Sequence, residues 1–553
     1  MRLVLIVVLL FAAYICLVAS AADASCDYSY RLVWVWGGID ISSREMLKPA
    51  TVSRFVRLVE QLHLMNANGL VVKASLEGGR NPRYLPQLRA ISDYLINYGI
   101  GLYLYIPYGP WSNDALSQNS INCPQSIDFA KRWNSLGELL FAEVPLLRGY
   151  IIKGTGYEGV PGPLDCKCAE CKSKTEQERM LAALKVLSKS VQKYNGVIFY
   201  RTWMTGALQD QEYKLFAGLS GKLPKNVFLV SKIGYGDFGV KEIPHPLFGH
   251  IQPRSQHIAE FQIFGEYRGL HYNACEMVTH WGEWLRTNKD FVGGFIGDIE
   301  VDRDIFDHPL NMVNWYAFGR FACEPDAKPD EIIAEWAEAT YGKDAVDVVS
   351  DVIKRTSVAT MKMMYFKGVW IQNHSWLPTL NYLDTHLRGP WVDMKRDEKL
   401  IGWGRSLDLF PPDQSAKYAA DPDFELFLER KEINPKILEE LLRQQSEAIA
   451  DYESMLARWR QGRGLMDERQ YSSVEHLLSA NVSDAKIWRL NTQAFISYLL
   501  GKDFEPFVRE MERIACRNEG TPLTSQPITE VIKSYRKRRN AKHSLFAPAQ
   551  KRN

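Results

Sequence analysis

The fold is decided by three consecutive segments: Leu147-Arg-Gly-Tyr-Ile-Ile-Lys153, the stretch from Glu176 to Tyr194, and Gly196-Val-Ile-Phe-Tyr-Arg201. The first and last are short apolar runs of the length that buried strands have. The stretch between them has helical character, and a helix between two strands is typical of a parallel strand pair. Both strands end in a basic residue, so each carries a positive charge at its carboxyl end.

The same alternation continues in both directions along the chain. Further apolar runs of strand length lie at 32–36, 69–73, 101–106, 226–232, 259–264 and 291–298. Helical stretches separate most of them, among them 52–65, 85–98 and 126–142. Eight strands alternating with helices predict an α/β fold, a (β/α)8 TIM barrel, which we place at residues 28–325. A doubly wound open sheet is the alternative that this pattern leaves open.

A second, α-helical domain is predicted at residues 326–528. Strand signals stop after Lys328, and the remaining periodic stretches are helical: 330–341, 345–365, 435–460 and 472–500. Pro435 suits a first helical turn, and an apolar stripe follows it. Association between copies of the chain through this domain is left open. Residues 529–553 are basic and are predicted to form a disordered tail; contact with an anionic surface or polyuronide is the alternative.

The N-terminus has the pattern of a cleavable signal peptide. Arg2 is followed by an apolar run from Leu3 to Val18 and then by small residues, so we expect a signal peptide at 1–24. An uncleaved membrane anchor is the alternative, although a span needs about 20 apolar residues. The protein is therefore expected to be secreted or periplasmic.

The composition is that of an ordinary globular protein. Of the 553 residues, 46% are hydrophobic and 24% are charged, which excludes wholesale disorder. Lys and Arg number 67 against 65 Asp and Glu, so the chain as a whole has no signature of nucleic-acid binding. Aromatic residues reach 12%, which fits sugar stacking but is more often explained by core filling.

Charged residues cluster where the predicted strands end, which in a barrel is where the active site lies. They are Lys153, Glu158, Arg201, Lys232, Asp237, Glu266 and Asp298. Cations at one barrel mouth suit a substrate carboxylate, because Arg can bind it with two prongs and Lys adds a point charge. Separated carboxylates suit glycoside hydrolysis by a proton donor and a base.

A nucleotide site is excluded, although Gly154-Thr-Gly-Tyr-Glu-Gly159 spells G-x-G-x-x-G after a strand. A dinucleotide loop must open a helix that meets the pyrophosphate. Here Val160-Pro-Gly-Pro163 follows at once and prevents that helix. We expect no nucleotide partner and no organic cofactor.

These strand-end segments resemble the α-glucuronidases of glycoside hydrolase family 67, which remove glucuronate side chains from xylan fragments. The resemblance extends from about Arg31 to Ser406. It rests on ordered motifs: Lys153 with Glu158-Gly-Val-Pro-Gly-Pro163, Arg201, Lys232-Ile-Gly-Tyr-Gly-Asp237-Phe238, Pro246-Leu-Phe-Gly249, Glu260-Phe-Gln-Ile-Phe-Gly-Glu266-Tyr267, His308-Pro-Leu310 and Tyr316-Ala-Phe-Gly-Arg320.

The resemblance implies a role for each site residue. Glu158 is implied as the general acid, and Asp237 and Glu266 as the carboxylates that activate water in an inverting reaction; which of the two is the base is left open. The substrate-binding residues are expected at the same mouth: Lys153, Arg201, Lys232, Tyr267 and Asp298. The implied substrate is an acidic oligosaccharide or polysaccharide of plant or algal origin.

The sequence also departs from the family. The family carries a β-rich domain before the barrel, which is missing here, and its first-strand W-D-N motif reads Trp36-Gly-Gly-Ile-Asp40. The sugar therefore stays open among glucuronate, 4-O-methylglucuronate and other uronic acids. A non-catalytic acidic-carbohydrate-binding barrel, a polysaccharide lyase and a retaining hydrolase are the alternatives.

Cysteines form the densest other cluster, Cys166-Lys-Cys168-Ala-Glu-Cys171, directly after the loop of the implied acid. With Cys123 as a fourth ligand, this spacing would suit a structural Zn²⁺. Disulfides, which export favours, are the alternative. Either arrangement would brace the loop that carries Glu158.

Overall fold

The computed structural model describes residues 26–36, 49–73, 76–77, 81–82, 85–109, 122–144, 146–154, 162–203, 209–234, 238, 244–264, 273–300, 305–366, 369–370, 377–383, 435–517 and 527–539. The signal peptide expected at 1–24 lies outside these ranges. Among the residues that are described, no helix is long and apolar enough to cross a membrane.

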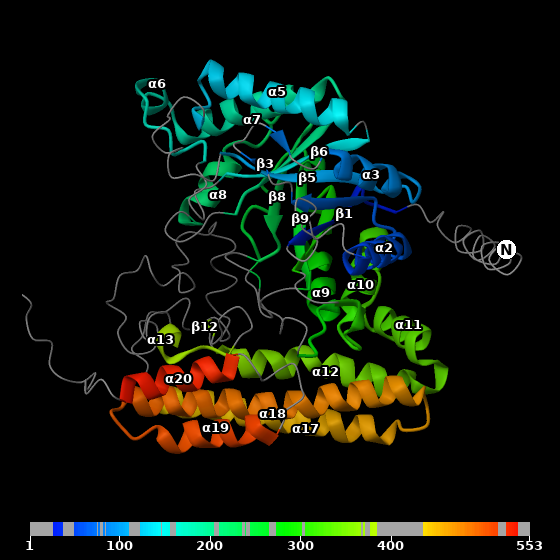
Figure 1. The fold of residues 1–553 in the computed structure, drawn as a ribbon, viewed down its shortest axis with the longest axis vertical. Coiled ribbons are helices and arrows are strands. Elements are labelled where there is room, and N and C mark those ends of the chain that lie inside the picture. The colour runs from blue at the N-terminus through cyan, green and yellow to red at the C-terminus, as the bar shows by residue number, and fades with distance from the viewer. Residues whose placement is uncertain are drawn as a thin grey trace, which may run out of the picture.

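Eight parallel strands close into a barrel (Figure 1). In order around the barrel they are β1 (Tyr30–Trp36), β2 (Gly69–Lys73), β5 (Gly101–Pro107), β6 (Leu147–Lys153), β7 (Val197–Arg201), β8 (Val227–Lys232), β9 (His257–Phe264) and β10 (Gly294–Glu300). The first strand pairs with the last in register from Tyr30 opposite Gly294 to Trp36 opposite Glu300. This closure confirms the predicted barrel and excludes the open sheet.

Amphipathic helices cover the outside of the barrel (Figure 1). They are α2 (Pro49–Leu64), α3 (Leu85–Ile96), α5 (Ile127–Glu143), α7 (Glu176–Gln192), α8 (Gln209–Ala217), α9 (Val278–Asn288) and α10 (Met312–Cys323). Helix α7 begins at a capping box, in which Thr175 and Glu178 satisfy each other's backbone N–H groups. Between β8 and β9 the described residues hold only the 3-10 turn Arg254–Gln256.

The barrel interior is built from alternate residues of each strand, as the two-residue period of strands requires. Its apolar members are Leu32, Trp34, Val71, Tyr103, Tyr105, Ile151, Phe199, Phe228, Val230, Ile258 and Ile296. Lys153, Arg201 and Lys232 each follow such a member by two residues, so they lie on the same inward face. The three basic residues therefore continue the core toward the carboxyl end of the barrel.

A layer of long helices lies beneath the barrel in the view of Figure 1. It contains α12 (Val346–Met364), α17 (Pro435–Gln461), α18 (Glu468–Leu499), α19 (Glu505–Arg517) and α20 (Pro527–Arg539), and α11 (Pro329–Tyr341) leads into it. The helical region is thus confirmed. The expectation that no strand follows the barrel was too simple, because Tyr365–Phe366 and Val369–Trp370 form a small antiparallel strand pair.

The predicted disordered tail starts too early. Residues 529–539 belong to α20, so the boundary at 528/529 falls inside a helix. Val531 and Tyr535 are fully buried, and the Tyr535 hydroxyl donates to the Asn491 backbone carbonyl at 3.1 Å. The charge run concealed a stripe of buried residues, Ile528, Val531, Ile532 and Tyr535, at helical spacing. Residues 540–553 lie outside the described ranges.

A disulfide joins the two ends of the barrel domain. Cys26, just before β1, is bonded to Cys323, the last residue of α10. The backbone N–H of Asp27 also donates to the Cys323 carbonyl at 3.3 Å. The covalent link therefore reinforces the same closure that the β1–β10 pairing makes.

Candidate active site

Three basic side chains converge at the carboxyl ends of three neighbouring strands. Lys153, Arg201 and Lys232 are the last residues of β6, β7 and β8, and Lys153 lies directly opposite Arg201 in the sheet register. Their exposed fractions are only 5%, 3% and 4%. Burial of this kind disfavours a charge unless other groups compensate it, so the surroundings of the three cations define what the site can bind.

Trp203 lies among these cations. The Nζ atoms of Lys153 and Lys232 lie 4.6 and 4.5 Å from its ring centroid. Lys232 Nζ also lies 4.1 Å from the Phe238 ring, and Arg201 Cζ lies 4.9 Å from the Trp34 ring. Cations over aromatic faces gain roughly 0.5–2 kcal/mol each, more when desolvated. These rings thus offset part of the cost of burying the charges.

Trp203 was not among the predicted site residues. It follows Arg201 by two residues, so the two-residue period of strands places it on the same inward face. That spacing could have predicted it. Lys73 was not predicted either. It is the last residue of β2, lies on the inward face of that strand and is exposed.

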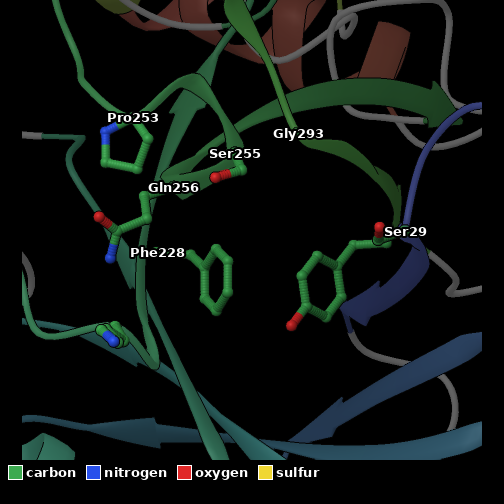
Figure 2. Close-up of a pocket in the computed structure, with 8 residues that line it drawn as sticks. Ser29, Phe228, Pro253, Ser255, Gln256 and Gly293 are labelled. Atoms are coloured by element: carbon green, nitrogen blue, oxygen red, sulfur yellow. The ribbon is translucent and has the colours of Figure 1, made fainter.

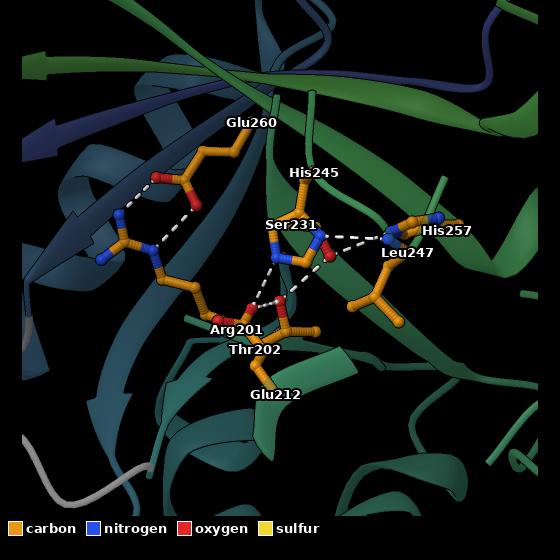
Figure 3. A network of polar contacts seen from close by, with 8 residues as sticks. All are labelled: Arg201, Thr202, Glu212, Ser231, His245, Leu247, His257 and Glu260. Carbon is orange, nitrogen blue, oxygen red and sulfur yellow. Dashed lines mark hydrogen bonds and ion pairs between the residues drawn. The ribbon is translucent and has the colours of Figure 1, made fainter. Parts of the chain in front are cut away.

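Arg201 is bound by the carboxylate of Glu260, a residue that was not predicted to belong to the site. Its Nε donates to Glu260 Oε2 at 2.8 Å, and Nη2 donates to Oε1, so the contact is bidentate (Figure 3). Glu260 is fully buried and lies in register with Lys232 on the neighbouring strand. The Nε–Nη2 edge of Arg201, which was expected to bind substrate with two prongs, is therefore occupied by the protein itself.

The implied catalytic carboxylates lie outside the described residues. Glu158 falls in the gap after Gly154, Asp237 in the gap after Gly234, and Glu266 with Tyr267 in the gap after Phe264. Each gap follows the carboxyl end of its strand, β6, β8 or β9 respectively. Asp298 is described: it lies in β10, is 5% exposed and is in register with Trp34.

A polar network fixes the outer side of the strands that carry these cations (Figure 3). Glu212 of α8 accepts from the Thr202 hydroxyl at 2.7 Å and lies 2.9 Å from His245 Nε2. The Ser231 hydroxyl lies 3.0 Å from that of Thr202 and 2.9 Å from His257 Nε2. Burial lowers the pKa of His257 to about 3, with a smaller contribution from His245. The network thus links β7, β8 and β9 to α8.

The segment 274–277, which follows the loop after β9, is hydrogen-bonded to side chains of the neighbouring helices. Four side chains accept hydrogen bonds from its backbone N–H groups: Asn481 from Ala274 at 3.1 Å, Asn311 from Cys275 at 2.8 Å, Thr356 from Glu276 at 2.9 Å and Asn314 from Met277 at 2.7 Å. These acceptors come from α10 and its N-cap, α12 and α18. Helices α10, α12 and α18 therefore fix one end of the loop that carries Glu266 and Tyr267.

Gly154, the first glycine of the G-x-G-x-x-G pattern, has a packing role. A Cβ atom there would lie 2.5 Å from Tyr108 Cβ and 2.9 Å from the Tyr200 hydroxyl oxygen. That hydroxyl donates to the Gly154 carbonyl at 3.1 Å. The glycine is needed because two tyrosines approach the backbone closely, which accounts for it without a nucleotide.

The four predicted cysteine ligands come together beside this loop. Their sulfur atoms all lie within 4.8 Å of one another. The backbone N–H of Cys171 donates to Cys168 Sγ at 3.3 Å and lowers the pKa of the Cys168 thiol to about 7. Burial raises the pKa of Cys123 to about 11.

A pocket of about 390 Å³ lies at the opposite end of the barrel (Figure 2). It is lined near the starts of β1, β8, β9 and β10 by residues that include Ser29, Tyr30, Phe228, Ser255, Gln256 and Gly293. None of the described residues that line it is a carboxylate. Because barrel enzymes react at the other end, this pocket is not the candidate active site.

Comparison with known families agrees with the geometry. Residues 35–307 match the glycosyl hydrolase family 67 middle domain, and residues 306–408 match the glycosyl hydrolase family 67 C-terminus. The chain belongs to glycosyl hydrolase family 67. In this family 67 chain the middle-domain match runs from the end of β1 through β10, and the C-terminal match takes in α10, α11 and α12.

Curated relatives of this family 67 chain are longer than it is. An alpha-glucuronidase of Hypocrea jecorina is 23% identical over 528 residues, which cover 85% of this chain and 60% of the relative. A probable alpha-glucuronidase A of Neosartorya fischeri is 26% identical over 356 residues, which cover 56% and 39%. The chain thus spans 60% or less of these two relatives.

A solved structure is similar only in outline. It is a family GH115 4-O-methyl-alpha-glucuronidase with specificity for decorated arabinogalactans, with a TM-score of 0.48 and 11% identity. The match covers 91% of this chain and 60% of that one.

Proposed function

We propose that the protein is an exported glycoside hydrolase that releases an α-linked uronic acid, glucuronate or 4-O-methylglucuronate, from plant or algal oligosaccharides or polysaccharides. The observation that carries the proposal is the group of three buried cations around Trp203 at the ends of β6, β7 and β8. Membership of family 67 and the names of the curated relatives support it.

The basic group suits a carboxylate better than a neutral hydroxyl. Lys153, Arg201 and Lys232 end three neighbouring strands, and their buried cationic groups all lie around one ring, that of Trp203. A uronate would add charge-assisted hydrogen bonds there. Lys153 and Lys232 make the direct contacts in our proposal. Arg201, whose Nε–Nη2 edge is bound to Glu260, contributes positive charge from behind them.

The strand order supports an inverting mechanism. Glu158 follows β6, whereas Asp237 and Glu266 follow β8 and β9, so at least one strand separates the acid from each of them. Neighbouring strands lie about 4.8 Å apart, and inverting enzymes hold their carboxylates roughly 6.5–9.5 Å apart with a water between them. Glu158 protonates the glycosidic oxygen, and one of the other two carboxylates takes a proton from the attacking water. Tyr267 and Asp298 contact the sugar.

Export is supported by the disulfide between Cys26 and Cys323, because such bonds persist in oxidising compartments. It is tested by sequencing the N-terminus of the mature protein from a secreting host. Loss of residues 1–24 is expected, and an intact N-terminus would favour a membrane anchor.

The activity is tested on a panel of α-linked uronosyl oligosaccharides, with release of free uronic acid as the readout. NMR of the first product anomer reports the stereochemistry, and initial release of the β-anomer is expected. An initial α-anomer indicates a retaining enzyme. Binding of the oligosaccharide without release favours a carbohydrate-binding barrel, and an unsaturated product indicates a lyase.

A further inference from the structure

The four-cysteine cluster joins two loops of the barrel. Cys123 lies just before α5, at the end of the loop after β5, and Cys166, Cys168 and Cys171 follow the loop after β6. Cys123, Cys166 and Cys171 are buried, and Cys168 is half-buried. We infer that these four thiolates bind a structural zinc ion that clamps the ends of the two loops together.

The sulfur separations fit a shared ion. Cys123 Sγ lies 3.7 Å from Cys168 Sγ and 3.5 Å from Cys171 Sγ. Four sulfurs about 2.3 Å from a tetrahedral zinc are about 3.8 Å from one another, whereas bonded sulfurs are about 2.05 Å apart. Cys123 approaches two cysteines equally closely, which a single disulfide partner does not explain. Four thiolates around one ion satisfy all of these contacts at once.

The surroundings suit the charge of such a site. A divalent ion with four thiolates carries two negative charges. The backbone N–H of Cys171 points at Cys168 Sγ, the kind of outer hydrogen bond that supports metal ligands. Arg179 of α7 donates to the carbonyls of Leu164 and, at 2.7 Å, of Cys166. This guanidinium fixes the segment that presents the ligands and brings positive charge close to it.

The position of the cluster gives the ion a mechanical role. The described chain resumes at Asn122 and at Gly162, immediately after the loops that follow β5 and β6. A zinc ion at this point ties both loops to α5 and α6 (Ala169–Lys172). The second loop carries Glu158, so the ion restrains the residue that we propose as the acid. This consequence rests on the proposed function, whereas metal binding itself does not.

Metal and thiol content test the site in the full-length protein, purified without reductant from a secreting host in zinc-containing medium. We expect about one zinc ion per chain by elemental mass spectrometry. After denaturation in a chelator without reductant, all four cluster cysteines should react with a thiol reagent, above the background of Cys275 and Cys516. Absence of zinc, with none of the four reacting, would show disulfides and overturn the proposal.

Matched variants locate the ion. Cys123→Ser should lose zinc and melt at a lower temperature, whereas Cys516→Ser, at an exposed free cysteine outside the cluster, should keep both. If Cys123→Ser does not fold, wild type loaded with Co²⁺ should show the visible absorption of a tetrahedral thiolate site. Octahedral spectra, or zinc retained in folded Cys123→Ser, would contradict the assignment. Zinc bound in a protein that releases no uronate would leave this proposal standing and refute the proposed function.

Discussion

Replacing Glu260 by Gln should destabilise the protein strongly, because the change leaves Arg201 charged inside the barrel. The pair is bidentate and its side chains are 4% and 0% exposed, so water cannot take over the role of the carboxylate. Removing one partner of such a buried pair costs about 3–5 kcal/mol. We therefore expect Glu260→Gln to shift the urea unfolding midpoint clearly downward, as followed by circular dichroism.

Two comparisons make this prediction sharp. Glu138→Gln breaks the surface pair with Lys193, whose side chains are 61% and 56% exposed, and should cost no more than about 1 kcal/mol. The double change Arg201→Met with Glu260→Met should recover much of the loss, because neither partner of the pair is then left buried without the other. If Glu260→Gln proves as mild as Glu138→Gln, the conclusion that the buried Arg201–Glu260 pair is needed for stability is wrong.

Four further changes test the site and the buried titratable groups. Lys232→Met should lower kcat/KM on a uronoside by roughly 10- to 150-fold and leave a neutral glycoside unaffected; equal loss on both would count against carboxylate recognition. Glu158→Gln should be severely slowed on natural substrates and rescued on aryl uronosides whose leaving group needs no proton, and absence of rescue would remove it as the acid. Burial lowers the pKa of His257 to about 3, so the unfolded state binds the extra proton and the free energy of unfolding should fall by about 1.4 kcal/mol per pH unit below about 6.5; the urea midpoints at pH 7 and pH 5 should therefore differ more in wild type than in His257→Gln. Burial raises the pKa of Asp484 to about 7, so the folded state holds that proton and loses stability as pH rises from about 4 to 7; Asp484→Asn should be the more stable protein at pH 8, by about 4 kcal/mol at most, and no more stable at pH 4.

The barrel was predictable because its signals are local. Each strand shows an apolar run of the right length, and the helix between two strands fixes their parallel direction. The inward placement of Lys153, Arg201 and Lys232 follows from the same two-residue period. Strand ends were harder to set. Strand β9 begins two residues before its predicted range, at polar His257. Strand β10 begins three residues after its predicted start, because Phe291 belongs to a 3-10 helix, and it ends two residues later than predicted, at polar Glu300.

The pairing of charges was not predictable in this way. Arg201 and Glu260 are 59 residues apart and lie on strands separated by β8, so their contact depends on the curvature of the closed barrel. The sequence showed three cations at strand ends. It did not show which of them is already paired with a buried carboxylate of the protein. The cysteine cluster was predicted in composition, and the fourth member, Cys123, lies where it was proposed. Our inference of zinc rather than disulfides depends on the distances between the sulfur atoms, which the sequence does not give.

The pairing of β1 with β10 has a consequence for the protein while it is being made. The residues that close the barrel, 294–300, leave the ribosome long after residues 30–36. At about 5–20 residues per second, β1 waits roughly 15–50 s for its second neighbour. During that time Leu32, Val33 and Val35, all fully or nearly fully buried in the finished protein, lie on a strand with one open edge, which is the kind of surface that recruits other chains. Synthesis of this protein should therefore depend on chaperones that hold the N-terminal third of the chain, and slowing translation between β2 and β10 should increase aggregation rather than relieve it.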